Sequence, residues 1–398
     1  MEIPQQIEET TPTDQLVIIA QLRRRLMDLM RIDSHKVIKP PDEAISFRGQ
    51  VQGDTKTAFD QMTERFASYG YTASLQSQAD GGHEVIAIKG VIDHRPGGRW
   101  LNVILFLITL FSVLYIGAAY GMSDAGLTIE NLDSASALTE PLKYLHLGLP
   151  FAGTLLGILL AHELSHYFVA RRYGSPVSLP YFVPMPLPPM GTMGAVIVQR
   201  APMRNRQAVF DIGVAGPLGG LVVAIPLLIL GLSLSSVQPP PPDVQEVLQE
   251  GNSLLYLGIK FLMFGKILPS NGEDVWLHSV AFAAWAGLLV TMINLIPVGQ
   301  LDGGHVSYAL LGRRSQILGH LVILAMLGWG GWNLINGNQA GGFWLLWSFL
   351  NMVMNQRHPP PLDDVTKLGG KRIVLGLAVL AIFILTFTPI PLQAVQLG

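Results

Sequence analysis

Cysteine is absent from all 398 residues of the sequence. Its absence excludes disulfide bonds and catalysis by a thiol. It also limits the protein ligands of any zinc ion to histidine, aspartate and glutamate. A catalytic metal centre in this chain must therefore be sought among those three residue types.

Charge is scarce as well. Asp, Glu, Lys and Arg make up 14% of the chain, against about 25% in a typical soluble domain. The mean hydropathy is +0.39, which favours an integral membrane protein with a soluble part. A net charge of −2 provides no basic surface, so we expect no nucleic-acid partner.

Apolar segments long enough to cross a bilayer of about 30 Å begin after Trp100. The sequence predicts a polytopic α-helical membrane protein with about seven transmembrane helices. Residues 254–269 carry two lysines and are expected to form an interfacial helix. The predicted spans are 101–120, 147–170, 209–235, 278–297, 318–336, 342–356 and 372–391.

The residues before these spans are polar and mixed. We expect a small α+β head over 1–98 and a membrane domain over 99–398. Within the head, apolar residues recur at helical spacing over Thr13–Ile32, and a β-α-β-β order follows. This head is either a substrate-binding or regulatory module or a spacer. The predicted β-α-β-β elements are Ala44–Gly49, Thr55–Tyr69, Thr72–Gln76 and Glu84–Lys89.

Basic and acidic loops alternate along the membrane domain. Arg171–Arg172 follow the second span and Arg313–Arg314 lie between the fourth and fifth, whereas Glu273–Asp274 precede the fourth. Cytoplasmic loops carry an excess of lysine and arginine. With seven spans, this pattern places the head in the cytoplasm.

The most informative motif is His162-Glu163-Leu164-Ser165-His166, which follows an uncharged run from Leu147 to Ala161. On a helix, residues i and i+4 share a face, so His162 and His166 can bind one metal ion. Glu163 then lies where a general base is needed. Ionisable groups at membrane depth are costly and usually functional. Around the motif and in the third span, Gly153/Gly157 and Gly216/Gly220 have the spacing that allows close helix packing.

A catalytic zinc requires a third protein ligand and an open position. No glutamate after Glu163 lies on the expected cytoplasmic side. The remaining candidates are Asp211, Asp302, His305 and His320. Asp302 is favoured because Pro297 ends an apolar helix and nearby glycines free the backbone to direct a carboxylate towards the metal.

Residues 175–200 form a proline-rich apolar stretch that cannot be a regular helix and is expected to associate with the membrane. It ends in Gly191–Gln199, which reads as a short strand. Either this strand pairs within its own hairpin, or an extended substrate peptide adds to it. In the second case Gly194, Ala195 and Val196 would contact substrate.

The two motifs together, H-E-x-x-H and N-x-x-P-x-x-x-x-D-G, resemble those of the site-2 protease family of intramembrane zinc metalloproteases. Asn294, Pro297, Asp302 and Gly303 match the second motif, and the resemblance covers a catalytic core of about 147–310. Asn294 has two open roles, either to orient the substrate carbonyl or oxyanion or to bond a neighbouring helix. The long head and the Gly191–Gln199 strand are similar to the cyanobacterial and chloroplast branch.

The resemblance implies one Zn²⁺ per chain, held by His162, His166 and Asp302, with Glu163 as the catalytic base. It also implies transmembrane protein substrates, cleaved in regulated intramembrane proteolysis in the lipid bilayer. A bacterial plasma or thylakoid membrane is the expected location. The alternative is a metal-ion transporter that uses the same residues as a transit site. The substrate and the oligomeric state are not specified by the sequence.

Overall fold

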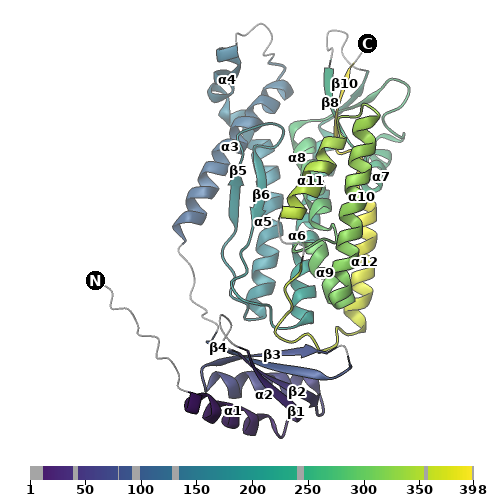
Figure 1. Cartoon of the computed structure of the whole chain (residues 1–398). Coiled ribbons are helices and arrows are strands. Elements are labelled where there is room, and N and C mark those ends of the chain that lie inside the picture. The colour runs from purple at the N-terminus through teal and green to yellow at the C-terminus, as the bar shows by residue number, and fades with distance from the viewer. Residues whose placement is uncertain are drawn as a thin grey trace. The chain divides into compact units, whose positions relative to one another are not determined.

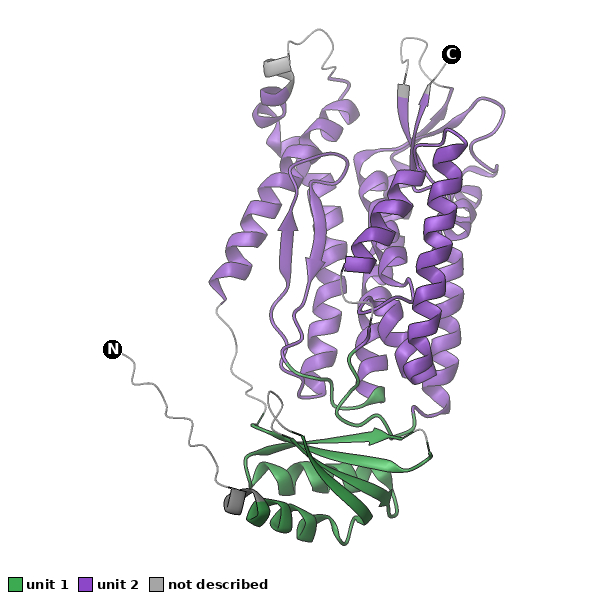
Figure 2. Ribbon diagram, viewed as in Figure 1, with its two compact units in different colours: residues 1–94, 201–206, 359–367 green, residues 95–200, 207–358, 368–398 purple. Residues whose placement is uncertain are grey.

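The computed structural model describes residues 12–38, 44–78, 80–91, 99–127, 134–239, 246–353 and 357–396. The chain forms two compact units, coloured separately in Figure 2. Unit 1 comprises residues 1–94, 201–206 and 359–367, and unit 2 comprises 95–200, 207–358 and 368–398. The boundary expected at residue 98 lies within 92–98, outside the described residues.

Unit 1 is a four-stranded antiparallel sheet covered by helices (Figure 1). The strand order is β1-β2-β4-β3. Asp54 caps α2 because its side chain accepts the N–H of Thr57 at 2.9 Å. Phe59, Met62 and Phe66 of α2 are buried in the core of this unit. The elements are α1 (Pro12–Leu26), β1 (Met30–Ile38), β2 (Ala44–Val51), α2 (Thr55–Ala67), β3 (Tyr71–Ser77) and β4 (His83–Lys89).

Two segments from much later in the chain complete unit 1. The N–H of Leu75 in β3 donates to the carbonyl of Leu362 at 2.6 Å, and the N–H of Leu362 donates to the carbonyl of Met203 at 2.8 Å. Asp363 is fully buried and its Oδ1 accepts the N–H groups of Val365 and Thr366, both at 3.0 Å. The edge of the sheet is therefore covered by backbone that sequence patterns assign to no element.

One element of the head was predicted wrongly. The helical pattern over Thr13–Ile32 is a helix only to Leu26, and Met30–Ile38 form the edge strand β1. Most side chains of β1 are not buried, and its apolar residues do not occupy alternate positions. Without that alternation the strand has no period-two signal. The other strands and α2 are confirmed within two residues at each end.

Unit 2 is a helical bundle with short two-stranded sheets (Figure 1). Three antiparallel pairs occur among its described residues: β5 (Tyr181–Pro184) with β6 (Thr192–Val196), β7 (Ser236–Gln238) with β9 (Asp274–Trp276), and β8 (Glu246–Glu250) with β10 (Leu392–Gln396). The helices are α3 (Trp100–Asp124), α4 (Ser134–Lys143), α5 (Leu149–Arg172), α6 (Arg206–Ser233), α7 (Leu254–Phe264), α8 (Ser279–Asn294), α9 (Asp302–Leu311), α10 (Ser315–Ile335), α11 (Gly341–Val353) and α12 (Gly370–Thr386).

Four helical segments among the described residues are long and apolar enough to cross a membrane: 100–124, 145–172, 206–233 and 302–335. The chain is thus a membrane protein by composition and helix length, but the count of seven spans stays a prediction. The predicted fourth span corresponds to α8, whose 16 residues rise about 24 Å. The predicted sixth span corresponds to α11, and its last residues, 354–356, are not among those described. The predicted interfacial segment forms α7, which is apolar but short.

Glycines set how closely some of these helices pack. A β-carbon at Gly231 of α6 would lie 2.3 Å from the backbone nitrogen of Ala281 in α8. By contrast, β-carbons at Gly153 and Gly157 of α5 would meet nothing within 4 Å among the described residues. The expectation that Gly153/Gly157 pack against another helix is therefore wrong, because that face of α5 is open.

Gly231→Ala is expected to destabilise the fold by about 1–3 kcal/mol, because backbone atoms of α8 must shift to admit a methyl group. Gly153→Ala is the matched control, since alanine there meets open space and favours the helix. Thermal unfolding of both variants in the same detergent measures the difference. Equal unfolding midpoints would contradict the close contact of α6 and α8.

Candidate metal centre

Helix α5 presents both histidines of the H-E-x-x-H motif on one buried face. His162 and His166 are 3% and 5% exposed. Asp302 is the first residue of α9 and is 9% exposed. The chain turns after α8, through Pro297 and Gly299, so that this carboxylate reaches the two imidazoles.

The three side chains form a tight triangle. His162 Nε2 lies 3.1 Å from Asp302 Oδ2, and His166 Nε2 lies 3.2 Å from Asp302 Oδ1. The two Nε2 atoms are 3.1 Å apart. Among the described residues, this is the one group of three or more metal-ligating side chains with such proximity. The donors of a tetrahedral zinc site with bonds of 2.0–2.1 Å lie about 3.3 Å apart, which matches these separations.

The protonation of His166 argues that a cation belongs at the centre of the triangle. Its Nδ1 lies 2.7 Å from the carbonyl oxygen of Ile212, and a carbonyl can only accept, so Nδ1 carries the proton. In the neutral ring, Nε2 then directs a lone pair towards the Asp302 carboxylate. Asp302 Oδ2 is buried and has no hydrogen-bond donor among the described residues. Facing lone pairs repel unless a metal ion lies between them, and a backbone carbonyl bound to the other ring nitrogen is typical of metal-binding histidine. The residues fit zinc.

Two further predicted residues lie beside this triangle. Glu163 is buried next to the ligands, and its carboxyl group interacts with the backbone N–H of Ile197, just after β6. Asn294, the last residue of α8, has its Nδ2 at 3.3 Å from His162 Nε2. A carboxylate and an amide donor thus flank the three metal ligands.

Helix α6 closes the back of the site with glycines. A β-carbon at Gly216 would lie 2.0 Å from His166 Nε2, and one at Gly219 would lie 2.0 Å from Ser165 Oγ. At Gly220 a β-carbon would lie 3.3 Å from His162 Nδ1. The predicted close packing at Gly216/Gly220 is confirmed, and it is specific to the metal-binding face of α5.

The other candidate third ligands are engaged elsewhere. Asp211 accepts two hydrogen bonds from Arg372, from Nε at 2.8 Å and Nη2 at 2.7 Å, and another from the Tyr173 hydroxyl. His305 Nδ1 lies 2.6 Å from His358 Nε2. His320 Nδ1 contacts the carbonyl of Gln316 at 2.5 Å in its own helix.

The proline-rich segment contains a β-hairpin. Strand β6 pairs with β5 through Tyr181 opposite Val196 and Phe182 opposite Ala195. One edge of β6 is therefore paired within its own hairpin. The other edge of β6 has no strand partner among the described residues. Gly194 has φ +105°, a backbone conformation that requires glycine.

Sequence reasoning missed the groups that support the site. The Ile212 carbonyl and the Ile197 N–H are backbone groups, which no sequence pattern marks. His358 lies 53 residues after His305 in the sequence, and only the folding of the chain brings the two side chains into contact. Glycines 213, 216, 219 and 220 were the one available signal, since such a run in an apolar helix indicates a close neighbour.

Known proteins resemble this chain over most of its length. Residues 150–327 match Peptidase family M50. The chain is 28% identical over 379 residues to the probable zinc metalloprotease EGY1, chloroplastic, of Arabidopsis thaliana, covering 87% of this chain and 66% of that protein. It is 30% identical over 319 residues to the rice (Oryza sativa subsp. japonica) protein of the same name, covering 76% and 53%.

Another relative is the probable zinc metalloprotease EGY2, chloroplastic, of Oryza sativa subsp. indica, with 27% identity over 372 residues, 89% of this chain and 63% of that protein. The chain spans less than two thirds of the length of these relatives. The matched region contains His162, His166 and Asp302. The resemblance read from the two motifs is confirmed: residues 150–327 carry a Peptidase family M50 (site-2 protease) domain, and the chain is similar to chloroplast zinc metalloproteases.

Proposed function

We propose that this chain is an intramembrane zinc metalloprotease that hydrolyses peptide bonds in or near transmembrane segments of membrane-anchored substrates. The observation that carries the proposal is the buried triangle of His162, His166 and Asp302, with Glu163 beside it in helices apolar enough to span a bilayer. Relatives named as probable zinc metalloproteases support it. The transporter alternative finds no support among them.

The protein groups have separate tasks. Zinc held by the two histidines and Asp302 would acidify water and polarise a peptide carbonyl. Glu163 accepts the proton of the attacking water and later delivers it to the leaving amine. The Ile197 N–H holds this carboxylate in place. Asn294 is placed to donate its amide N–H to the oxygen that becomes negative in the transition state.

Substrate is proposed to add to β6 at Gly194, Ala195 and Val196. A regular helix hides its carbonyl groups, so the substrate must be extended before attack. Main-chain pairing along an open strand edge extends the peptide and positions its carbonyl at once. The interaction of the Ile197 N–H with the Glu163 carboxyl group supports this, because it puts the end of the strand beside the proposed base.

Location and domain roles are part of the proposal. A head over 1–98 in the cytoplasm, a membrane domain over 99–398 and a bacterial plasma or thylakoid membrane agree with the charge pattern and with chloroplast relatives. Within this arrangement the protease would release membrane-anchored proteins, as in regulated intramembrane proteolysis.

Glu163→Gln is expected to reduce cleavage by about 10²–10⁴-fold while zinc content is unchanged, because an amide keeps the shape but cannot accept the proton. Cleavage of a reporter transmembrane substrate in proteoliposomes, with metal analysis of the same sample, measures both. A variant that cleaves at the normal rate would refute general-base hydrolysis by this residue.

Asp302→Ala is expected to lose both zinc and activity, because it removes one of three ligands. His305→Ala should keep most of its zinc, since His305 bonds His358 rather than joining the triangle. Zinc measured after gel filtration distinguishes the two. The reverse pattern would identify His305 as the third ligand.

The strand proposal predicts a site-specific cross-link. The chain has no native cysteine, so Val196→Cys introduces a single thiol at a side chain that is 53% exposed. In the Glu163→Gln background this thiol should form a disulfide with a cysteine near the scissile bond of the substrate. Val222→Cys, exposed on α6, is the control. Equal cross-linking at both positions would mean that β6 does not bind substrate.

A further inference from the structure

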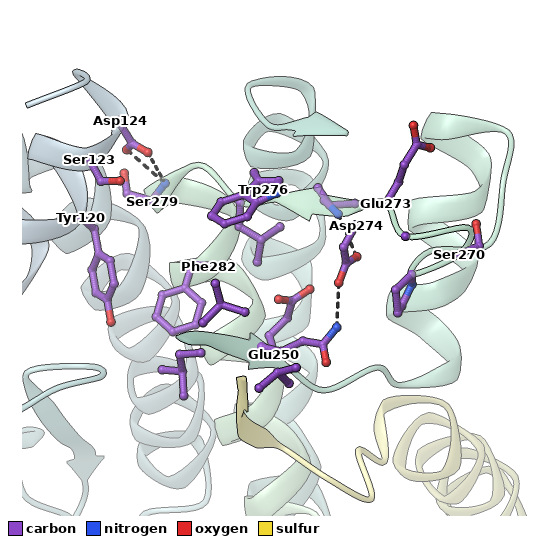
Figure 3. Close-up of a pocket in the computed structure, with 18 residues that line it drawn as sticks. Tyr120, Ser123, Asp124, Glu250, Ser270, Glu273, Asp274, Trp276, Ser279 and Phe282 are labelled. Carbon is purple, nitrogen blue, oxygen red and sulfur yellow. Dashed lines mark hydrogen bonds between the residues drawn. The ribbon is translucent and has the colours of Figure 1, made fainter. Parts of the chain in front are cut away.

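Unit 2 contains a second candidate site, a cavity of about 740 Å³. Its walls come from the end of α3, strands β8, β9 and β10, and the start of α8 (Figure 3). Ligand sites typically measure about 300–1,000 Å³ and combine apolar walls with a few polar groups. Here the rings of Tyr120, Trp276 and Phe282 line the cavity together with Glu250 and Asp274.

The cavity is distinct from the metal centre. Ser279, at the start of α8, lines the cavity, and Asn294, at the other end of the same helix, lies beside His162. At a rise of 1.5 Å per residue these two ends are about 22 Å apart. A ligand in the cavity therefore cannot contact the metal ligands.

Glu250 supplies a buried carboxylate to the lining of this cavity. It is 8% exposed, and its Oε1 accepts the Tyr256 hydroxyl at 3.0 Å and lies 3.7 Å from Lys260 Nζ. Figure 3 shows the carboxylate of Glu250 projecting into the space between the aromatic rings and Asp274. A carboxylate in such a desolvated place is stabilised by each charged donor that reaches it, so a cationic ligand would be favoured here.

The charges around Glu250 do not balance. Lys260 is fully buried and lies 3.9 Å from Asp274 as well, so one ammonium group serves two carboxylates. The other acids of the cavity are neutralised. Asp124 accepts the N–H of Ser279 at 3.1 Å, at the positive end of α8, and Glu273 pairs with Lys266. When both are ionised, Glu250 and Asp274 therefore carry one more negative charge than Lys260 alone compensates.

These features select the class of ligand. A metal ion is disfavoured because Glu250 and Asp274 share a lysine and belong to no group of three ligands among the described residues. Aromatic faces attract organic cations and also bury an apolar body. We propose that this cavity binds an amphipathic cation, a primary amine or guanidinium group carried on an apolar body. The cation would bond the Glu250 carboxylate, and the body would lie against Tyr120, Trp276 and Phe282.

Binding to the full chain in lipid nanodiscs tests the proposal with three probes of one shape: phenylbutylamine, phenylbutanol and phenylbutyrate. In titration calorimetry the amine should bind at least about tenfold more tightly than the alcohol, as expected for a charge-assisted hydrogen bond of about 1.5–3 kcal/mol. The acid should not bind. Equal binding of amine and alcohol would overturn the proposal.

Two variants test whether the preference for the amine over the alcohol arises in this cavity. Glu250→Gln keeps the shape and should remove the preference for the amine, and Asp274→Asn should reduce it. Glu140→Gln is the matched control, because Glu140 lies on α4 outside the cavity and pairs with Lys143. An unchanged preference in both cavity variants would place the amine elsewhere.

The pH dependence has a definite sign. Burial raises the pKa of Glu250 to about 7, against the neighbouring charge of Lys260. Below that pH the carboxyl is neutral, and above it the carboxylate attracts the cation, while an alkyl amine stays charged throughout. Amine affinity should therefore rise between about pH 6 and about pH 8. Affinity that falls over this interval would contradict the role of Glu250.

The same assay identifies the source of the cation. Acetyl-Leu-Lys-Leu-amide carries the cation on a peptide, and acetyl-Leu-Gln-Leu-amide is its neutral counterpart. A preference for the lysine peptide assigns the site to a basic side chain of a polypeptide, whereas binding of phenylbutylamine alone assigns it to a small amine. If neither cation binds better than its neutral counterpart, the proposal fails.

Discussion

The arrangement of the membrane domain depends on three lone pairs that meet in a buried space. His162, His166 and Asp302 bring them within 3.1–3.2 Å of one another. In an apolar interior such a group is unfavourable without a cation, because the neutral His166 ring already donates its one N–H to the Ile212 carbonyl and has no second proton for the carboxylate. A metal ion turns this repulsion into the contact that joins α5 to α9.

The triangle in turn constrains the helices around it. α6 must approach α5 closely enough for the Ile212 carbonyl to accept the His166 proton, and glycine is required where α6 faces the His166 and Ser165 side chains. Gly216 and Gly219 have no room for a methyl group. The bond of Arg372 to Asp211 joins α12 to the start of α6, so several helices depend on this region. A side chain at Gly216 would therefore disturb the metal site without removing a ligand.

The hairpin of β5 and β6 adjoins the H-E-x-x-H motif. Its strand β6 ends beside Glu163, whose carboxyl group interacts with the backbone N–H of Ile197. At the other end of α8, the cavity around Glu250 has a different composition, with aromatic walls and one uncompensated negative charge. One helix, α8, thus connects two chemically distinct sites, with Asn294 at the metal and Ser279 at the cavity.

The sequence alone determined the chemistry of this protein. The i, i+4 spacing of His162 and His166 puts both on one helix face wherever the helix lies, and the apolar flanks predict membrane helices. The turn signals at Pro297 and Gly303 selected Asp302 from four candidates, and the triangle contains it. The strands and helix of the head from Ala44 onwards also follow from local periodicity.

Only the tertiary structure decided what depends on distant contacts. Edge strand β1 lacks apolar alternation, so its pairing with β2, not its own pattern, makes it a strand. The segments 201–206 and 359–367 join the head through backbone hydrogen bonds, and backbone groups carry no sequence signal. The same holds for the carbonyl of Ile212, the N–H of Ile197 and the buried charge of Glu250. Local spacing specifies which residues can react, whereas long-range packing specifies which groups hold them.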